Sequence, residues 1–160
     1  MARSSVQRAE RCSILAHAGA RGKSEVWLPN GGIPLTRKLY RGMKADGKQP
    51  LIARSRRALG VVLGDAGDVR PDEAGTVHPG YGMSVAPDDP TNLPLHRRPA
   101  ELAGTGSDPV WEILEDVLPG RLSFAADTLE HGVVQPAKPM ALADYEEALA
   151  DTSANWTRFT

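Results

Sequence analysis

Glycine and proline are unusually frequent in this chain, which has 16 glycines and 13 prolines among its 160 residues. Together they make up about 18% of the sequence, against about 12% in an average protein. Because glycine weakens regular elements and proline interrupts them, long helices and coiled coils are not expected. The share stays below the roughly 25–30% that is typical of disordered chains. The sequence therefore predicts a folded domain with much of its length in shaped loops.

The charge balance and the single cysteine exclude several classes of protein. Lys and Arg number 19 against 20 for Asp and Glu, so the chain lacks the positive excess of a dedicated nucleic-acid-binding protein. Cys12 has no cysteine partner, which excludes an internal disulfide and a multi-cysteine zinc site. The four histidines are scattered, so their spacing indicates no metal site. No apolar run approaches the ~20 residues that a membrane helix needs, and no membrane partner is expected.

The N-terminal 23 residues are basic and rich in serine, and they resemble a transit peptide only faintly because Glu10 does not fit one. A short helix is expected over residues 4–17. We therefore expect two parts, a helical or frayed segment over residues 1–23 and a single domain over residues 24–160.

Short strands and short helices are both expected in the rest of the chain. Short strands are expected over residues 24–28, 36–43, 81–86, 121–126 and 131–135, and the first ends at the turn signal Pro29-Asn30-Gly31-Gly32. Proline at the start and glycine after the end predict helices over residues 50–59 and 109–118. A third helix is expected from Ala141, with Leu142, Tyr145 and Leu149 on one face. Since the strands and helices show no βαβ rhythm, the expected fold class is α+β.

Polar residues near strand ends are the candidate functional residues. Arg41 precedes Gly42, and a guanidinium there could hold a diphosphate by two parallel hydrogen bonds while the glycine permits close approach. Ser84 follows two glycines, and its hydroxyl could support a ribose or a catalytic side chain. A surface arginine on an edge strand and a strand serine facing water fit the same patterns.

The pair Glu130-His131 stands directly before the last predicted strand. A carboxylate or an imidazole at this place could accept a proton from a hydroxyl or stabilise a developing positive charge. A plain turn before a strand fits the pattern as well.

Three segments, LYRGMKADG, YGMSV and HGVVQPAKPM, occur in this order over residues 36–142. They resemble the NAD-dependent ADP-ribosyltransferase-like toxins that bacterial type VI secretion delivers. The resemblance implies a small fold of split antiparallel sheets with short flanking helices and an NAD cleft between the sheets. It implies that Arg41 grips the NAD with Tyr40 stacking beside it, and that Met83-Ser84 form the middle motif, with Ser84 as its hydroxyl.

The third motif departs from the wider superfamily, where a glutamate commonly stands four residues before the first proline of a late strand. That place is Gly132 in this chain, and Glu130 is the nearest carboxylate. His131 matches the toxin subfamily, so we expect His131 to be catalytic ahead of Glu130. The loop over residues 87–99 could recognise the acceptor or close over the cofactor, or it could be a solvated loop packed on the sheet.

The resemblance implies an enzyme that uses NAD as a substrate, transferring ADP-ribose to a target macromolecule or hydrolysing NAD. It also implies a cognate immunity protein, and a protein that acts in the cytoplasm of a cell into which it is delivered. The alternative is a non-catalytic binding module that keeps this fold and acts through protein partners, which Gly132 at the glutamate position favours.

Overall fold

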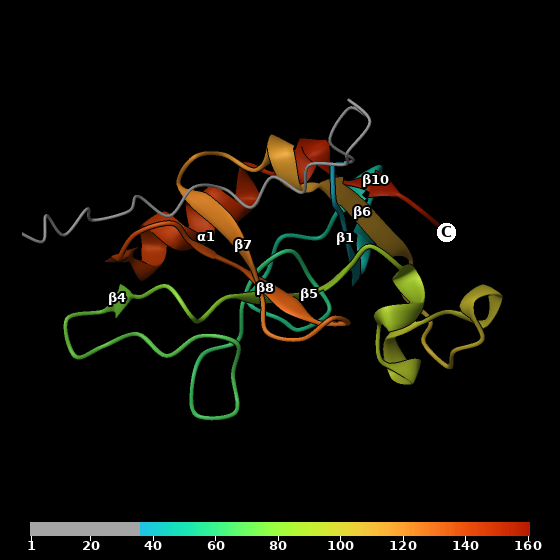
Figure 1. Cartoon of the computed structure of the whole chain (residues 1–160), viewed down its shortest axis with the longest axis horizontal. Coiled ribbons are helices and arrows are strands. Elements are labelled where there is room, and N and C mark those ends of the chain that lie inside the picture. Colours follow the sequence, from blue (N-terminus) through green and yellow to red (C-terminus); the bar gives the residue numbers. More distant parts are fainter. Residues whose placement is uncertain (1–35) are drawn as a thin grey trace, which may run out of the picture. The chain divides into compact units, whose positions relative to one another are not determined.

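The computed structural model describes residues 36–160. A six-stranded antiparallel sheet runs through this part of the chain in the order β10-β6-β1-β5-β8-β7 (Figure 1). Its strands are β1 (Lys38–Gly42), β5 (Met83–Pro87), β6 (Val110–Leu114), β7 (Leu122–Ala126), β8 (Gly132–Pro136) and β10 (Thr157–Arg158). The helix expected over residues 4–17, the strand expected over 24–28 and the expected domain boundary after residue 23 lie outside the described residues.

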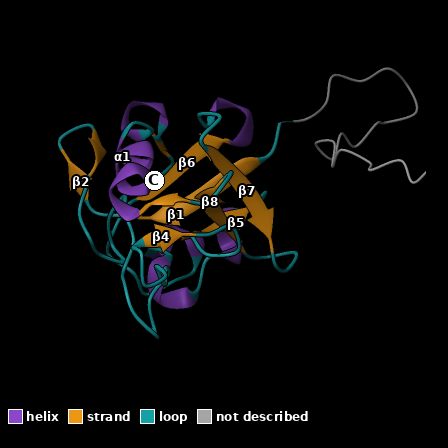
Figure 2. Cartoon of the chain, turned by 90° about the vertical axis from the view of Figure 1, so that its left-hand side faces the viewer, coloured by secondary structure: helices purple, strands orange, loops and turns teal. Residues whose placement is uncertain are grey.

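Smaller elements surround this sheet (Figure 2). Two short antiparallel pairs join β2 (Ala45–Asp46) to β3 (Gln49–Pro50) and β4 (Thr76–Val77) to β9 (Met140–Ala141). The α-helix α1 (Leu142–Ala150) follows β9, and five 3₁₀ turns complete the set: η1 (Pro90–Asn92), η2 (Leu95–Arg97), η3 (Ala100–Leu102), η4 (Glu115–Val117) and η5 (Ser153–Asn155). The expected α+β class is confirmed. Within residues 36–160 no helix is long and apolar enough to cross a membrane.

The two faces of β1 belong to two different apolar clusters, as the alternation of side chains along a strand requires. Leu39 and Met43 lie in the main core, which also takes in Tyr145 and Leu149 of α1. Tyr40, on the opposite face of β1, packs in a second cluster with residues of β5, β6 and the loop after β5. The side chain of Arg41 shares its face of the strand with the main core.

The sheet splits at β5, because this strand changes its partner along its length. Its last two residues, Ala86 and Pro87, pair with β1, whereas its first three residues pair with β8. The end of β1 that carries Arg41 and the start of β5 that carries Ser84 are therefore joined by no ladder hydrogen bond. This divergence lies at the cavity that Arg41 and Ser84 line.

All four strands expected in the described residues are present as β1, β5, β7 and β8, and the last expected helix is present as α1. The helix expected over residues 109–118 is wrong, since this segment forms β6 and the turn η4. Every residue of β6 pairs with β1, and Trp111 and Ile113 point together into the main core. Pairing within the sheet outweighs the helical spacing of the apolar residues.

The helix expected over residues 50–59 is also wrong. Pro50 pairs with Ala45 in a short strand, and the following residues form turns. The carbonyls of Arg56 and Ala58 in this loop accept hydrogen bonds from Arg41. In a helix these carbonyls would accept hydrogen bonds from backbone N–H groups of the same helix. Their hydrogen bonds to the buried guanidinium of Arg41 therefore compete with helix formation.

Candidate active site

A cavity of about 330 Å³ lies where β1 and β5 diverge. Arg41 and Gly42 line it from β1, and Ser84 to Ala86 line it from β5. Glu130 and His131, at the turn between β7 and β8, reach the same cavity. Its remaining lining residues come from loops: Arg56, Asp68, Asn92, Leu93, Pro94, His96 and Arg97.

Arg41 is almost fully buried, with 5% of its surface exposed. All of its hydrogen-bond partners in the described part of the chain are backbone carbonyl oxygens. They are Ser84 at 2.5 Å from Nη1, Ala58 at 3.3 Å from Nε, and Arg56 and Gly60 at 3.3 and 3.5 Å from Nη2. The side chain therefore ties β1 to β5 where the sheet splits, and it holds the loop over residues 56–60 against both.

The guanidinium of Arg41 lies in a poorly solvated environment. Burial lowers its pKa to about 10, and the charge of Arg97 adds to this effect while that of Asp68 opposes it. A pKa of this size leaves the guanidinium protonated at neutral pH. The cavity therefore has a permanent positive charge in its wall.

Ser84 contacts a carboxylate that the sequence did not single out. Its Oγ donates to Oδ1 of Asp68 at 3.4 Å, and the backbone N–H of Val62 donates to Oδ2 of Asp68 at 3.0 Å. The backbone N–H of Asp68 in turn donates to the carbonyl of Val62 at 2.8 Å. The carboxylate of Asp68 is thus fixed from two sides within the cavity wall.

His131 forms a hydrogen-bonded pair with Asp127 across the end of the β7–β8 hairpin. Its Nδ1 lies 2.8 and 2.9 Å from the two carboxylate oxygens. Partial burial alone would raise the pKa of Asp127, but the hydrogen bond and charge of His131 outweigh it, and the pKa is lowered. A proton on Nδ1 leaves Nε2 as the acceptor in the neutral ring. Thr128 Oγ1 accepts from the backbone N–H groups of Glu130 and His131 and so shapes the turn.

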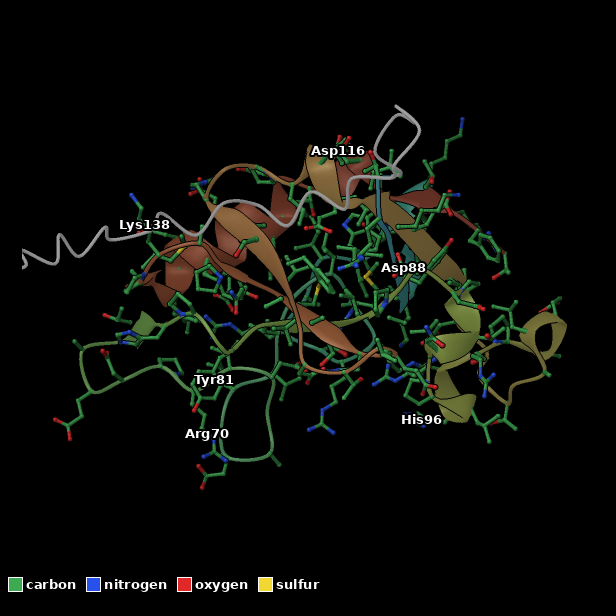
Figure 3. The ribbon with its side chains drawn as sticks, in the orientation of Figure 1. Arg70, Tyr81, Asp88, His96, Asp116 and Lys138 are labelled. Atoms are coloured by element: carbon green, nitrogen blue, oxygen red, sulfur yellow. The ribbon has the colours of Figure 1, made fainter. Side chains whose placement is uncertain are left out.

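The charged side chains around the cavity are predominantly cationic. Arg41, Arg56 and Arg97 face two carboxylates, Asp68 and Glu130. Arg97 Nη1 donates to the carbonyl of Arg56 at 2.7 Å, which links the two loops that carry these arginines. His96, labelled in Figure 3, lies on η2 at this end of the molecule. This arrangement can attract an anionic ligand such as a diphosphate.

The structure brings together five of the seven residues singled out by sequence. These are Arg41, Gly42, Ser84, Glu130 and His131. Tyr40 and Met83 do not line the cavity. Tyr40 packs edge-on against Phe159 at 5.5 Å between ring centroids, and Met83 is buried in the main core.

The two glycines singled out by sequence, Gly42 and Gly132, both lie close against neighbouring residues. A Cβ on Gly42 would lie 2.8 Å from the carbonyl oxygen of Arg97. A Cβ on Gly132 would lie 2.5 Å from Phe124 and 2.6 Å from the carbonyl oxygen of Ala125. A glutamate therefore does not fit at Gly132 unless the backbone of β7 and β8 moves.

Several lining residues were missed or only grouped with a loop by the sequence. Asn92, His96 and Arg97 belong to the loop over residues 87–99, for which contact with the acceptor or cofactor and a solvated loop packed on the sheet were both open. Arg56 lies in the segment for which a helix was expected, and Asp68 lies in a stretch for which no helix or strand was expected. No local signal distinguishes Asp68, since its partners Val62 and Ser84 come from a loop closure and from a distant strand.

Comparison with known proteins agrees with this geometry. The family model described as Tse2 ADP-ribosyltransferase toxin matches residues 37–160. No curated protein and no solved structure matches the chain. The matched range covers β1 through β10, including every residue that lines the cavity. The chain belongs to the Tse2 ADP-ribosyltransferase toxin family.

Proposed function

We propose that this protein breaks the nicotinamide–ribose bond of NAD and transfers the ADP-ribose to a target macromolecule or to water. The observation that carries the proposal is the single cavity lined by Arg41, Ser84 and His131 in a chain of this family. The three side chains come from β1, β5 and the β7–β8 turn, and they meet where the sheet splits.

The cavity suits one part of NAD. Its volume of about 330 Å³ is near the lower end of ligand pockets, which measure roughly 300–1,000 Å³. The nicotinamide and its ribose would lie inside, and the diphosphate would lie at the mouth. Arg56 and Arg97 are more exposed than Arg41, so they would hydrogen-bond the diphosphate directly. Arg41 would contribute its charge while it holds the cavity wall together.

His131 suits the role of a general base toward the acceptor. With Nδ1 hydrogen-bonded to Asp127, Nε2 can take the proton of an attacking hydroxyl or water. Within residues 36–160, Nε2 of His131 has no hydrogen-bond partner of its own. Glu130, exposed beside it, also lines the cavity.

The test is release of nicotinamide from NAD by the purified protein. We expect His131→Ala and Arg41→Ala to lower the rate at least tenfold, which corresponds to about 1.4 kcal/mol. His78 provides a matched control, because it also pairs with an aspartate, Asp72, at 2.9 Å but does not line the cavity. His78→Ala should retain the wild-type rate. Folded wild-type protein that releases no nicotinamide would refute the proposal.

A non-catalytic binding module is the second candidate, and Gly132 favours it. The strand position where the superfamily commonly has a glutamate has no room for one here. This candidate expects no nicotinamide release under any condition, whether or not NAD raises the melting temperature. Measuring turnover and the NAD-induced shift on the same sample distinguishes the two functions.

Membership of a toxin family implies further partners, which we also propose here. Action in the cytoplasm of a target cell would give access to NAD, and a cognate immunity protein would protect the producer. Growth arrest on expression of the wild type, but not of His131→Ala, is the expected result. Equal growth of both strains at equal protein levels would contradict this part of the proposal.

A further inference from the structure

We propose that Asp68 is the carboxylate that stabilises the positive charge on the ribose as nicotinamide leaves. The inference rests on the proposed NAD chemistry and assigns one of its catalytic residues. Asp68 lines the cavity, it is held by Ser84, and neither the family motifs nor the local sequence points to it.

The reaction needs such a group. When the bond between C1′ and the nicotinamide nitrogen breaks, the electron pair stays with the nitrogen and nicotinamide leaves as a neutral molecule. The positive charge then lies on C1′ and the ribose ring oxygen. A fixed anion beside this sugar lowers the barrier, as carboxylates do in glycoside hydrolysis.

Position favours Asp68 over the other carboxylate at the cavity. Glu130 is exposed on the hairpin turn, and within residues 36–160 its carboxylate has no hydrogen-bond partner. Asp68 is half-buried, with one oxygen held by the Val62 N–H at 3.0 Å and the other by the Ser84 hydroxyl at 3.4 Å. A group held in place before the reaction stabilises the transition state better than one that must first be ordered.

The loop that carries Asp68 is closed tightly around Val62. The carbonyl of Val62 accepts from the backbone N–H groups of Asp68 and Val69 at 2.8 and 3.3 Å. Gly67 packs against the same carbonyl so closely that a Cβ would come within 2.3 Å of its oxygen. The aspartate therefore lies in a loop that backbone hydrogen bonds and close packing hold in place, although that loop has little regular structure.

The charges nearby suit an anion at this place. The positive charge of the buried Arg41 guanidinium and the negative charge of Asp68 attract each other across the cavity wall. Each oxygen of Asp68 accepts one hydrogen bond from the protein, which leaves lone pairs for a ribose hydroxyl. In the complete step the acceptor oxygen bonds to C1′ and its proton passes to Nε2 of His131. Asp68 forms no covalent bond.

The first experiment compares Asp68→Asn with the wild type in nicotinamide release. Asparagine keeps the shape and an oxygen that accepts from Val62, but it removes the charge. We expect kcat to fall by about 100-fold or more, with KM for NAD unchanged within about threefold. Asp65→Asn is the matched control, because Asp65 lies in the same loop with its side chain fully exposed and does not line the cavity. It should retain the wild-type rate.

The second experiment separates a catalytic role from a structural one. In Asp68→Ala, sodium azide should restore nicotinamide release in a concentration-dependent way. Azide bonds to C1′ as the bond to nicotinamide breaks, and the products are ADP-ribosyl azide and neutral nicotinamide, which mass spectrometry identifies. The wild type and Asp65→Ala should show no such stimulation. Recovery of a damaged fold would not produce an azide adduct.

The outcomes are distinct for the two proposals. If the wild type releases nicotinamide and Asp68→Asn keeps more than a third of that rate, the assignment of Asp68 is overturned while the proposed function stands. A variant that melts much earlier, with no azide product from Asp68→Ala, assigns Asp68 a structural role and also overturns the inference. If the folded wild type releases no nicotinamide, the proposed function fails and the assignment of Asp68 falls with it.

Discussion

Tyr145 of α1 bridges the paired strands β5 and β8, and its replacement by phenylalanine tests this directly. Met83 of β5 and Val134 of β8 are opposite partners in the sheet. The Tyr145 hydroxyl, from α1, lies between them: it accepts from the N–H of Met83 at 3.0 Å and donates to the carbonyl of Val134 at 2.6 Å. Tyr145 is fully buried, and this burial raises the pKa of its hydroxyl well above its usual value. The hydroxyl therefore stays protonated and makes both bonds at any ordinary pH.

The expected cost follows from the two groups that lose their partner. A buried backbone N–H or C=O left unpaired costs about 1–3 kcal/mol, so two cost about 2–6 kcal/mol. Part is recovered if the backbones of Met83 and Val134 draw together, and we expect Tyr145→Phe to lose about 2–4 kcal/mol of unfolding free energy. For a domain of this size that loss lowers the melting temperature by about 8–16 °C.

Urea unfolding followed by tryptophan fluorescence measures the loss, since Trp111 and Trp156 lie in the same core. Tyr81→Phe is the control: this tyrosine is 46% exposed, and its change should stay below about 0.5 kcal/mol. Because Ser84 follows Met83, nicotinamide release should also fall in Tyr145→Phe. A loss of less than about 0.5 kcal/mol in Tyr145→Phe would refute the role of the hydroxyl as a bridge.

Three further changes test the β7–β8 hairpin. Gly132→Ala should cost about 1–3 kcal/mol by crowding Phe124, and denaturant unfolding measures it; a variant as stable as the wild type would contradict the close packing. Asp127→Asn should move the His131 proton from Nδ1 toward Nε2 and lower nicotinamide release, and ¹⁵N shifts of the imidazole report the tautomer without any substrate. Asp127→Ala should melt below the wild type at pH 6, where the carboxylate is paired. Because pairing lowers its pKa below the ordinary 3.8, this difference should disappear as the pH falls through that lowered value, and a gap that persists in acid would count against the pair.

The sequence predicts well those elements that can be recognised from a local pattern of residues. The strands β1, β5, β7 and β8 lie in short segments bounded by loops, and α1 buries Tyr145 and Leu149 on one face as its spacing predicts. The strand β6 is not predicted in this way, because its apolar residues fit the apolar stripe of a helix as well as a strand. Only the pairing of all five of its residues with β1 decides between the two, and that pairing is a long-range property.

The candidate site is predictable to a similar degree. Arg41, Ser84 and His131 stand in short motifs, and the structure gathers them at one cavity. The partners of these residues are not predictable in this way. Arg41 donates to a loop that resembles a helix start in sequence, and Asp68 meets Ser84 only through the fold. Hydrogen bonds between segments that are distant in the chain produce no periodic pattern in the sequence, so they cannot be predicted from it.

The hydrogen bonds of Tyr145 also bear on when the cavity can form during synthesis of the chain. Every cavity-lining residue precedes the helix that carries this hydroxyl, and β10, which closes one edge of the sheet, lies within the last four residues. A chain still emerging from the ribosome has all of its site residues before it has the means to hold them together. The cavity can therefore form completely only after α1 has been synthesised and has packed against β5 and β8.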